Sequence, residues 1–523
     1  MKTATRAQMR ALDARAISEA GIPGETLMER AGAGVARVVR RLTEHAGWAP
    51  RCLLVAGKGA NGGDALVAAR HLKATGYEVA VVSACEASAW TGDARIHLGK
   101  MTAAGIAVSE RPAVEDWAGP FDDDFERMAP CVVVDGILGT GLEGAARGVS
   151  ARAIERVNEA GRCRPVVAID IPSGLDADTG MAAGPAVRAD ATVTMGYPKR
   201  GFLACAALDY VGTVDVVDIG IPAAYAEALP TGAEMISASD MADLISPLPR
   251  QAHKGSRGHT LIIAGSRGYA GAAGLAARAA LRSGAGLVTV LTARSVAPIV
   301  AGLAPEAMVH CGAETEAGML AKDAGRGWTR DVKDFNAVLI GPGLGVGADT
   351  LAWVERVLGR SATPAVLDAD ALSVCAGRLE MIRQARCPVT VTPHPGEMAR
   401  LLGSTAQDVQ ADRVGTALST ARDLRCVTVL KGAGTVVCQP DGHPHVNMTG
   451  NPGMACGGSG DALAGLLAGL LAQGIGPFDA ARLAVHAHGM AGDIAAWRRS
   501  QAGMTAADLV DAIPCAWKVM RGR

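Results

Sequence analysis

The sequence predicts an α/β protein made of two tandem three-layer domains, and three observations support this prediction. The chain has 523 residues, whereas a single hydrophobic core stops growing at roughly 250–300 residues. Short, continuous apolar runs alternate with helix-length stretches, which is typical of a parallel sheet covered on both faces. Glycine contributes 66 residues, nearly twice its ordinary share of about 7%. This excess indicates many tight strand-to-helix turns of the kind that nucleotide-binding enzymes use.

The first half opens with two predicted helices. Residues 5–20 place apolar side chains at helical spacing, and a second helix is expected after Gly24. The apolar runs that predict strands lie at 52–56, 79–82, 131–134, 166–169 and 191–195. We expect this domain to end near the extended segment 214–220.

The second half carries its own series of strands. Residues 222–249 are rich in alanine, proline and serine and have few strong strand signals, so they are interpreted as a linker. The strands that follow are predicted at 260–264, 287–291, 337–340, 365–367, 389–392, 427–430 and 435–438. The predicted domains span 1–225 and 226–523. Because the two halves share no repeated motif, they are expected to be different domains rather than a duplication.

Composition excludes several classes of function. Lys and Arg total 51 against 52 Asp and Glu, which argues against a surface for nucleic acid, and 3% aromatic residues are too few for stacking platforms. The longest uncharged apolar stretch, 462–478, is shorter than the roughly 20 residues that a membrane span needs. The first 16 residues lack a secretory apolar segment, and the 12 cysteines form no C-x-x-C pair. We expect a cytoplasmic protein without a membrane anchor.

A glycine-rich segment, GKGANGGD at 57–64, separates a predicted strand from a predicted helix over 65–73. Glycines there let the backbone approach a phosphate, and a helix amino terminus supplies oriented N–H groups. The segment differs from the usual G-x-G-x-x-G pattern. A structural turn without a ligand therefore remains an alternative, with Asp64 as a helix cap.

Polar side chains follow the next strands of this half. Asp135 and Asp170 each lie at the carboxyl end of a predicted buried strand, the edge where open α/β sheets bind ligands. Asn61, Asp135 and Ser173 supply oxygens that suit a monovalent cation or a ribose. The alternative is that both aspartates cap the turns that follow them.

The strongest signal of the second half is NPGMACGGSGD at 451–461, directly before a predicted apolar helix over 462–472. Backbone N–H groups of Gly457 to Gly460 can form an anion hole at the start of that helix. Asp461 in its first turn is placed to deprotonate a hydroxyl that faces a bound phosphoryl group. A structural cap explains Asp461 alone but leaves the glycines unexplained.

Other strand ends of this half also carry polar residues or glycines. His394 lies in a Pro-His-Pro bend and either contacts a ligand or is an ordinary packed or solvated histidine. Lys431 lies in a turn between two strands, suitable for nucleotide phosphates. The segments GPGLG at 341–345 and DAD at 368–370 follow two more strands. The Walker pattern G-x-x-x-x-G-K-[ST] is absent from the sequence.

These motifs resemble two known families. The first half resembles the NAD(P)H-hydrate epimerases of the YjeF amino-terminal type, which have a Rossmann-like fold, through NGGD at 61–64, VDGILGTG at 134–141, DIPSG at 170–174 and YPKRG at 197–201. The second half resembles the ribokinase-like ADP- or ATP-dependent NAD(P)H-hydrate dehydratases, through HKG at 253–255, GPGLG at 341–345, DADAL at 368–372, TPHPGE at 392–397, LKGAGT at 430–435 and NPGMACGGSGD at 451–461. The resemblance covers nearly the whole chain and implies a bifunctional repair enzyme.

The resemblance implies a two-step repair of reduced nicotinamide cofactors that are hydrated at C6, called NADHX and NADPHX. The first domain would interconvert the R and S epimers. The second would phosphorylate the C6 hydroxyl of the S form with ADP or ATP and Mg²⁺, after which phosphate leaves and NADH or NADPH is restored. A small-molecule kinase of the ribokinase superfamily and a nucleotide-sensing scaffold remain as alternatives.

The resemblance also assigns residues by position. Asp461 would be the catalytic base. Separately, the resemblance leads us to expect a homo-oligomer. Hydrate contacts would be Ala60, Asn61, Gly62, Gly63, Asp64, Gly139, Thr140, Gly141, Leu142, Glu143, Gly144, Ala145 and Asp170 in the first domain, and Gly343, His394 and Asp461 in the second. Nucleotide contacts would be Lys431, Gly432, Ala433, Gly434, Thr435 and Gly460, and potassium ligands would be Asn61, Asp135 and Ser173. The acid and base of epimerisation stay open, with Asp64 and Asp170 as candidates.

One position departs from the family pattern. The epimerases commonly read NGGDG, whereas Ala65 follows Asp64 here. We expect epimerisation to survive, because alanine is small and favours a helix at that position.

Overall fold

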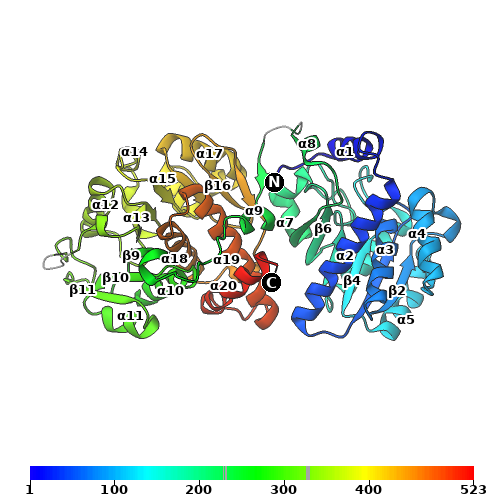
Figure 1. Cartoon of the computed structure of the whole chain (residues 1–523), viewed down its shortest axis with the longest axis horizontal. Helices are drawn as coiled ribbons and strands as arrows, with labels where there is room; N and C mark the ends of the chain where they lie inside the picture. Colours follow the sequence, from blue (N-terminus) through cyan, green and yellow to red (C-terminus); the bar gives the residue numbers. More distant parts are fainter. Residues whose placement is uncertain (228, 230–231, 326–329, 523) are drawn as a thin grey trace. The chain divides into compact units, whose positions relative to one another are not determined.

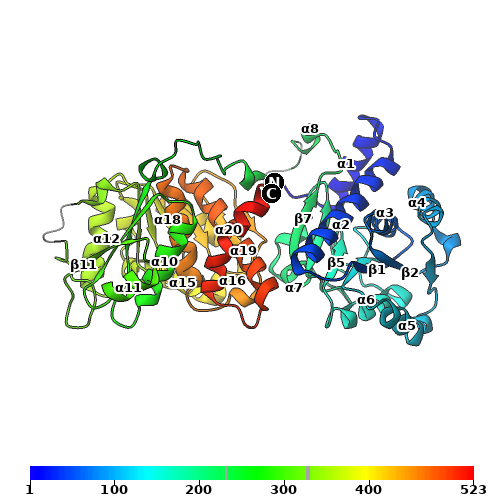
Figure 2. The same cartoon turned by 60° about the horizontal axis from the view of Figure 1, so that its bottom comes forward.

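The computed structural model describes residues 1–227, 229, 232–325 and 330–522 of the chain. The chain folds into two compact units, Met1–Met235 and Ile236–Arg523, and each is a mainly parallel sheet between two layers of helices (Figures 1 and 2). The predicted fold class is therefore confirmed. Residues 228, 230 and 231 of the predicted linker lie outside the described residues.

The sheet of the first unit is parallel throughout, with the strand order β3-β2-β1-β4-β5-β6-β7. Its strands are β1 (Arg51–Ala56), β2 (Glu78–Ser83), β3 (Val108–Glu110), β4 (Val132–Gly136), β5 (Val166–Ile169), β6 (Ala191–Met195) and β7 (Thr213–Val217). The order reverses between β1 and β4, and ligands of open α/β sheets bind at such a switch point, beyond the carboxyl ends of the strands. The ends of β1, β4 and β5 and the segments that follow them carry the predicted site residues of this unit.

Helices cover both faces of this sheet because alternate strand residues point to opposite sides. Leu54 and Val134 face one layer, whereas Leu53 and Val133 face the other. The first layer contains α1 (Arg6–Ser18), α2 (Gly24–Ala46), α3 (Ala60–Ala74) and α4 (Gly92–Ala103), and the second contains α5 (Gly119–Met128) and α6 (Gly148–Ala160). The short elements α7 (Leu208–Val211), α8 (Ala223–Ala226) and β8 (Glu234–Met235) complete the unit.

The second unit has the strand order β11-β10-β9-β12-β13-β14-β15-β16-β17, which reverses between β9 and β12. Its strands are β9 (His259–Ile263), β10 (Leu287–Ala293), β11 (Met308–Gly312), β12 (Ala337–Ile340), β13 (Ala365–Leu367), β14 (Val389–Val391), β15 (Val427–Leu430), β16 (Thr435–Cys438) and β17 (His445–Asn447). The strands from β11 to β15 are parallel, whereas β16 pairs antiparallel with both β15 and β17. The predicted strand, turn and strand around Lys431 are thus a hairpin.

Helices again form two layers. One contains α9 (Ala238–Ala242), α10 (Ala270–Arg282), α11 (Ala297–Leu303), α18 (Ser459–Ala472), α19 (Pro477–Arg499) and α20 (Ala506–Met520). The other contains α12 (Ala348–Arg360), α13 (Asp370–Cys375), α14 (Glu380–Arg383), α15 (Pro395–Leu402), α16 (Ala406–Ala411) and α17 (Arg413–Leu424). The apolar helix α18 is buried from Ala462 to Ala472. Among the described residues, no helix combines the length and the apolar character needed to cross a membrane.

The start of α3 differs from the sequence prediction. The predicted helix began at Ala65, but α3 begins at Ala60, so the glycines of NGGD lie in its first turns and Asp64 is not its cap. Tertiary packing overrides the low helix propensity of glycine here, since a Cβ on Gly62 would lie only 1.7 Å from the carbonyl oxygen of Gly57. The glycines therefore allow the helix to approach the β1 turn.

Candidate active sites of the two units

A buried aspartate marks the switch point of the first unit. Asp135, at the end of β4, is fully buried and accepts hydrogen bonds from the Ser173 hydroxyl (2.6 Å) and from the Ser173 and Ile137 N–H groups (2.8 and 3.1 Å). Burial raises the pKa of Asp135 to about 6, although these hydrogen bonds lower it. Within the described part of the chain, all hydrogen-bond donors to the Asp135 carboxyl group are therefore uncharged.

Asn61, in the first turn of α3, reaches the same place. Its Nδ2 atom donates to the carbonyl oxygens of Leu138 (3.1 Å) and Ile169 (2.6 Å). The Leu138 carbonyl also accepts from the Ser173 hydroxyl (3.1 Å). The structure therefore brings Asn61, Asp135 and Ser173 together with two backbone carbonyl groups, as the positions of the strands predicted.

The predicted hydrate contacts at 139–145 form a partly exposed loop that follows β4. This loop begins against Asn61, since a Cβ on Gly139 would lie 2.4 Å from the Asn61 Oδ1 atom. The contacts at 60–64 lie at the start of α3. The two predicted segments thus meet at the switch point.

Asp170 forms a buried ion pair that the sequence did not reveal. It follows β5 with a φ of +62°, in the left-handed region that few residues other than glycine adopt. Its Oδ1 atom accepts from the Nζ atom of Lys199, which is 1% exposed, from the Met195 N–H group (3.1 Å) and from the Thr194 hydroxyl (3.3 Å). Lys199 lies in the YPKRG segment, whose sequence gave no sign of this pairing.

Asp64 lies in the same charged cluster. It is 6% exposed, and no side chain of the described residues donates a hydrogen bond to its carboxyl group. Burial raises the pKa of Asp64 well above its ordinary value, the negative charges of Asp170 and Asp13 raise it further, and Lys199 lowers it. The surroundings of Asp64, which include the Asp170–Lys199 pair, therefore favour its protonated form.

In the second unit, Asp461 lies in the first turn of α18, as predicted. The helix is capped by Gly458 with a φ of +93°, and the Cβ position of Gly457 faces open space. Burial raises the pKa of Asp461 to about 7, the charge of Asp368 raises it as well, and Lys431 opposes them. The start of the helix thus presents backbone N–H groups beside a carboxyl group whose pKa is about 7.

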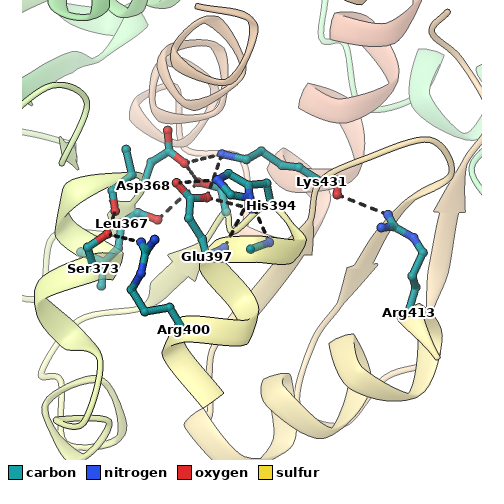
Figure 3. Close-up of polar contacts among 11 residues, drawn as sticks. Leu367, Asp368, Ser373, His394, Glu397, Arg400, Arg413 and Lys431 are labelled. Carbon is teal, nitrogen blue, oxygen red and sulfur yellow. Dashed lines mark hydrogen bonds and ion pairs between the residues drawn. The ribbon is translucent and has the colours of Figure 1, made fainter. Parts of the chain in front are cut away.

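Lys431 points into this site, toward carboxylates rather than away from the protein. Its Nζ atom lies 2.7 Å from Asp368 Oδ1 and 3.6 Å from Glu397 Oε2 (Figure 3). A Cβ on Gly460 would lie 3.3 Å from the same Nζ atom. Burial alone would lower the pKa of Lys431, but the charges of Asp368 and Glu397 outweigh it and raise that pKa. Lys431 therefore places a fixed positive charge at the start of α18.

His394 has a structural role that limits what it can bind. It caps α15, because its Nδ1 atom accepts from the N–H groups of Gly396 (3.0 Å) and Glu397 (3.3 Å). Its Nε2 atom lies 3.6 Å from Glu397 Oε1, and its side chain is 55% exposed (Figure 3). Only Nε2 remains to meet a ligand.

The loop that contains Gly343 joins the site through Asp370. The Gly345 N–H group donates to Asp370 Oδ2 (2.8 Å), and the Ser266 hydroxyl donates to the Gly343 carbonyl (2.8 Å). Ala369, between Asp368 and Asp370, has a φ of +50°. Strain of this kind in an alanine is typical of a functional site.

Two supporting residues have no sequence signal. Arg413, on α17, donates to the carbonyl groups of Leu430, Lys431 and Gly434 and so fixes the turn that carries Lys431. Asp493, on α19, accepts from the Gly450 N–H group and from Asn451 Nδ2, both at 2.9 Å, and fixes the segment before α18. Neither residue lies in a motif, so only the fold reveals them.

Comparisons with known proteins agree with both halves. Residues 24–201 match the family described as YjeF-related protein N-terminus, and residues 260–515 match the NAD(P)H-hydrate dehydratase family. The bifunctional NAD(P)H-hydrate repair enzyme Nnr of Moorella thermoacetica is 42% identical over 98% of this chain and 96% of its own, and that of Thermofilum pendens is 38% identical over 100% and 97%. An ADP/ATP-dependent NAD(P)H-hydrate dehydratase from Bacillus subtilis, co-crystallised with ATP/Mg²⁺, superposes with a TM-score of 0.49 and 32% identity over 56% of this chain and 100% of its own. The chain therefore belongs to the family of bifunctional NAD(P)H-hydrate repair enzymes.

Proposed function

We propose that residues 1–225 interconvert R- and S-NAD(P)HX and that residues 226–523 dehydrate the S epimer with ADP or ATP. The main support for the dehydratase activity is that Asp461 and Lys431 lie together at the open start of α18. Such an arrangement brings together a helix start that can bind an anion, a positively charged side chain and a base. It suits transfer of a phosphoryl group to a hydroxyl.

For dehydration, Asp461 takes the proton of the C6 hydroxyl, whose oxygen attacks the terminal phosphorus of the nucleotide. The bond from that phosphorus to the bridging oxygen breaks, and AMP or ADP leaves. The new C6 phosphate then departs with the electrons of its C–O bond, C5 loses a proton, and the C5–C6 double bond of NADH or NADPH forms. A base with a pKa of about 7 suits the first step, while Lys431 and the N–H groups of Gly457 to Gly460 balance the phosphoryl charge.

The donors of this site fit a magnesium ion that is bound largely by the nucleotide. Among the described residues, no group of three or more His, Cys, Asp or Glu side chains is arranged to hold a metal. Mg²⁺ usually binds one or two carboxylates and completes its shell with phosphates and water. We propose that a carboxylate of the Asp368, Glu397 and Asp461 group supplies the protein contact.

For epimerisation, inversion at C6 requires a bond from C6 to oxygen or to N1 to break and form again. Either route adds a proton to the atom that leaves and removes one from the hydroxyl or water oxygen. Asp64, whose raised pKa favours the protonated form, and Asp170, whose Oδ2 atom accepts no hydrogen bond within the described chain, suit the two roles. We propose Asp64 as the acid and Asp170 as the base.

The residues at Asp135 fit a potassium ion. Asp135, Ser173, Asn61 and the carbonyl groups of Leu138 and Ile169 offer the oxygen ligands that hard cations prefer. Asp135 is a buried carboxyl group bonded only to neutral donors, and a cation would balance its charge. We propose that potassium holds the β4 and β5 loops in place for the hydrate.

One experiment tests both activities. A mixture of R- and S-NADHX is given to the protein with ADP or ATP, and the return of NADH absorbance is followed with and without potassium. We expect full recovery with potassium, and without it a stall once the S epimer is spent. A stall in both conditions would contradict the epimerase assignment. A stable phosphorylated product in place of inorganic phosphate would favour the small-molecule kinase.

The Ala65→Gly variant is expected to change the epimerisation rate by less than about threefold. Ala65 is fully buried against β4, since a Cβ on Gly136 would lie 2.9 Å from the Ala65 Cβ. Its methyl group thus fills space between α3 and the sheet. The glycine variant is expected to lose about 1 kcal/mol of unfolding free energy in urea, because glycine destabilises a helix interior. Epimerisation that is many-fold faster in this variant would show that Ala65 obstructs the hydrate.

A further inference from the structure

In the first unit, one buried lysine is paired with one carboxyl group and interacts electrostatically with two more. Asp64 comes from α3, Asp170 from the end of β5, and Asp13 from α1, which precedes the matched region 24–201. Burial raises the pKa of Asp13 to about 6, the charge of Asp170 adds to this, and Lys199 opposes it. The three acids and Lys199 therefore act on one another.

Asp13 lies on the buried face of its helix. Met9, Asp13 and Ala16 are spaced by four and three residues, so they share one face of α1, and Met9 and Ala16 belong to the core. The Asp13 Oδ1 atom is buried without a hydrogen-bond partner among the described residues. An unpaired carboxyl group on an apolar face is costly to folding, which indicates a role other than packing.

The fold holds α1 in place beside this cluster. The Ala4 N–H group donates to the Pro198 carbonyl and the Arg200 N–H group donates to the Ala4 carbonyl, both at 2.9 Å, on either side of Lys199. Arg6 binds the loop that follows Asp170, through its N–H group to Asp178 Oδ1 and through Nη2 to Asp176 Oδ2, both at 2.7 Å. The start of α1 is thus anchored to the two segments that carry Asp170 and Lys199.

We propose that α1 is part of the epimerase site and that Asp13 is a positioning residue, which keeps a proton on the cluster for transfer to the hydrate. This inference rests on the proposed epimerase function. Carboxyl groups that interact with one another disfavour each other's ionised form. With Asp170 held by Lys199, the charge of Asp13 favours the protonated form of Asp64. Asp13 thus acts through Asp64 and not on the substrate.

The test follows the equilibration of pure R-NADHX with its S epimer by chromatography, without nucleotide and between pH 6 and 9. The Asp13→Asn variant is expected to react about tenfold more slowly at pH 8. Loss of a nearby negative charge lowers the pKa of Asp64, so the pH at which the rate falls on the alkaline side moves to a lower value. Asp13→Glu is expected to restore both the rate and the profile.

Met9→Ala is the matched control, because it loosens the same face of α1 without changing a charge. It is expected to lower the melting temperature and to leave the pH profile in place, whereas Asp13→Asn melts no lower than the wild type. If the wild type is active and Asp13→Asn has the same pH profile, the proposed role of Asp13 is overturned, while the epimerase function stands. A wild type that leaves R-NADHX unchanged would overturn the epimerase function and the inference with it.

Discussion

Replacing Asp461 with asparagine is expected to slow the nucleotide-dependent dehydration of S-NADHX by about 10²–10⁴-fold, the usual contribution of a positioned general base. Asparagine keeps the shape of the side chain but cannot accept the C6 hydroxyl proton. The measurement is the return of NADH absorbance from pure S-NADHX at saturating ATP. Epimerisation of R-NADHX by the same variant is expected to be unchanged, because its residues lie in the other unit.

The matched control for this prediction is Asp479→Asn. Asp479 also lies in the first turn of a helix, α19, but it is paired with Arg482 and is 41% exposed. If the effect of Asp461 came only from a negative charge at a helix start, the two variants would behave alike. Dehydration that proceeds at the wild-type rate in Asp461→Asn would remove Asp461 from the reaction.

The raised pKa of Asp461 also fixes the pH dependence. A base must be deprotonated, so the rate of dehydration is expected to rise with pH through about 7. Stability changes in the opposite sense, because a carboxyl group whose pKa is raised by folding loses stabilisation as pH rises from its unfolded value through its folded one. At pH 8 the Asp461→Asn variant is therefore expected to be more stable than the wild type, by about 1 kcal/mol or more. Its loss of activity would then not result from unfolding.

The parts of the fold that follow from local pattern were predictable. Continuous apolar runs such as 166–169 and 337–340 predicted buried parallel strands, and the structure has β5 and β12 at those residues. Because parallel strands end at a common edge, the same pattern indicated that Asn61, Asp135 and Ser173 meet, and they do. Position along a strand was therefore enough to find the edge of the sheet.

Contacts between distant segments were not predictable. The start of α3 depends on the close approach of Gly62 to Gly57, which packing decides and helix propensity does not. The direction of Lys431 depends on Asp368 and Glu397, which belong to other strand ends. In the sequence, Lys199 and Asp13 are an ordinary lysine and an ordinary aspartate. Only the structure shows that Lys199 pairs with Asp170 and that burial, together with the charge of Asp170, raises the pKa of Asp13.

The Asp170→Asn variant is expected to abolish epimerisation, with a loss of about 10²–10⁴-fold, and it also breaks a buried ion pair. Leaving a buried lysine unpaired lowers the free energy of unfolding by about 3–5 kcal/mol. With this single variant, a loss of catalysis therefore cannot be separated from unfolding of the first unit. The double variant Asp170→Asn/Lys199→Met removes both charges, and replacing both members of a buried pair is often neutral for stability.

The double variant therefore separates the two effects of Asp170. It is expected to melt near the wild-type temperature and to dehydrate S-NADHX normally, yet to leave R-NADHX unconverted. If it regained epimerisation, Asp170 would act only by neutralising Lys199, and the base would have to be another group of the cluster. Burial raises the pKa of Asp64 well above its ordinary value, whereas that of Asp13 is raised to about 6, so Asp13 would be the candidate. The α1 helix would then supply the base itself.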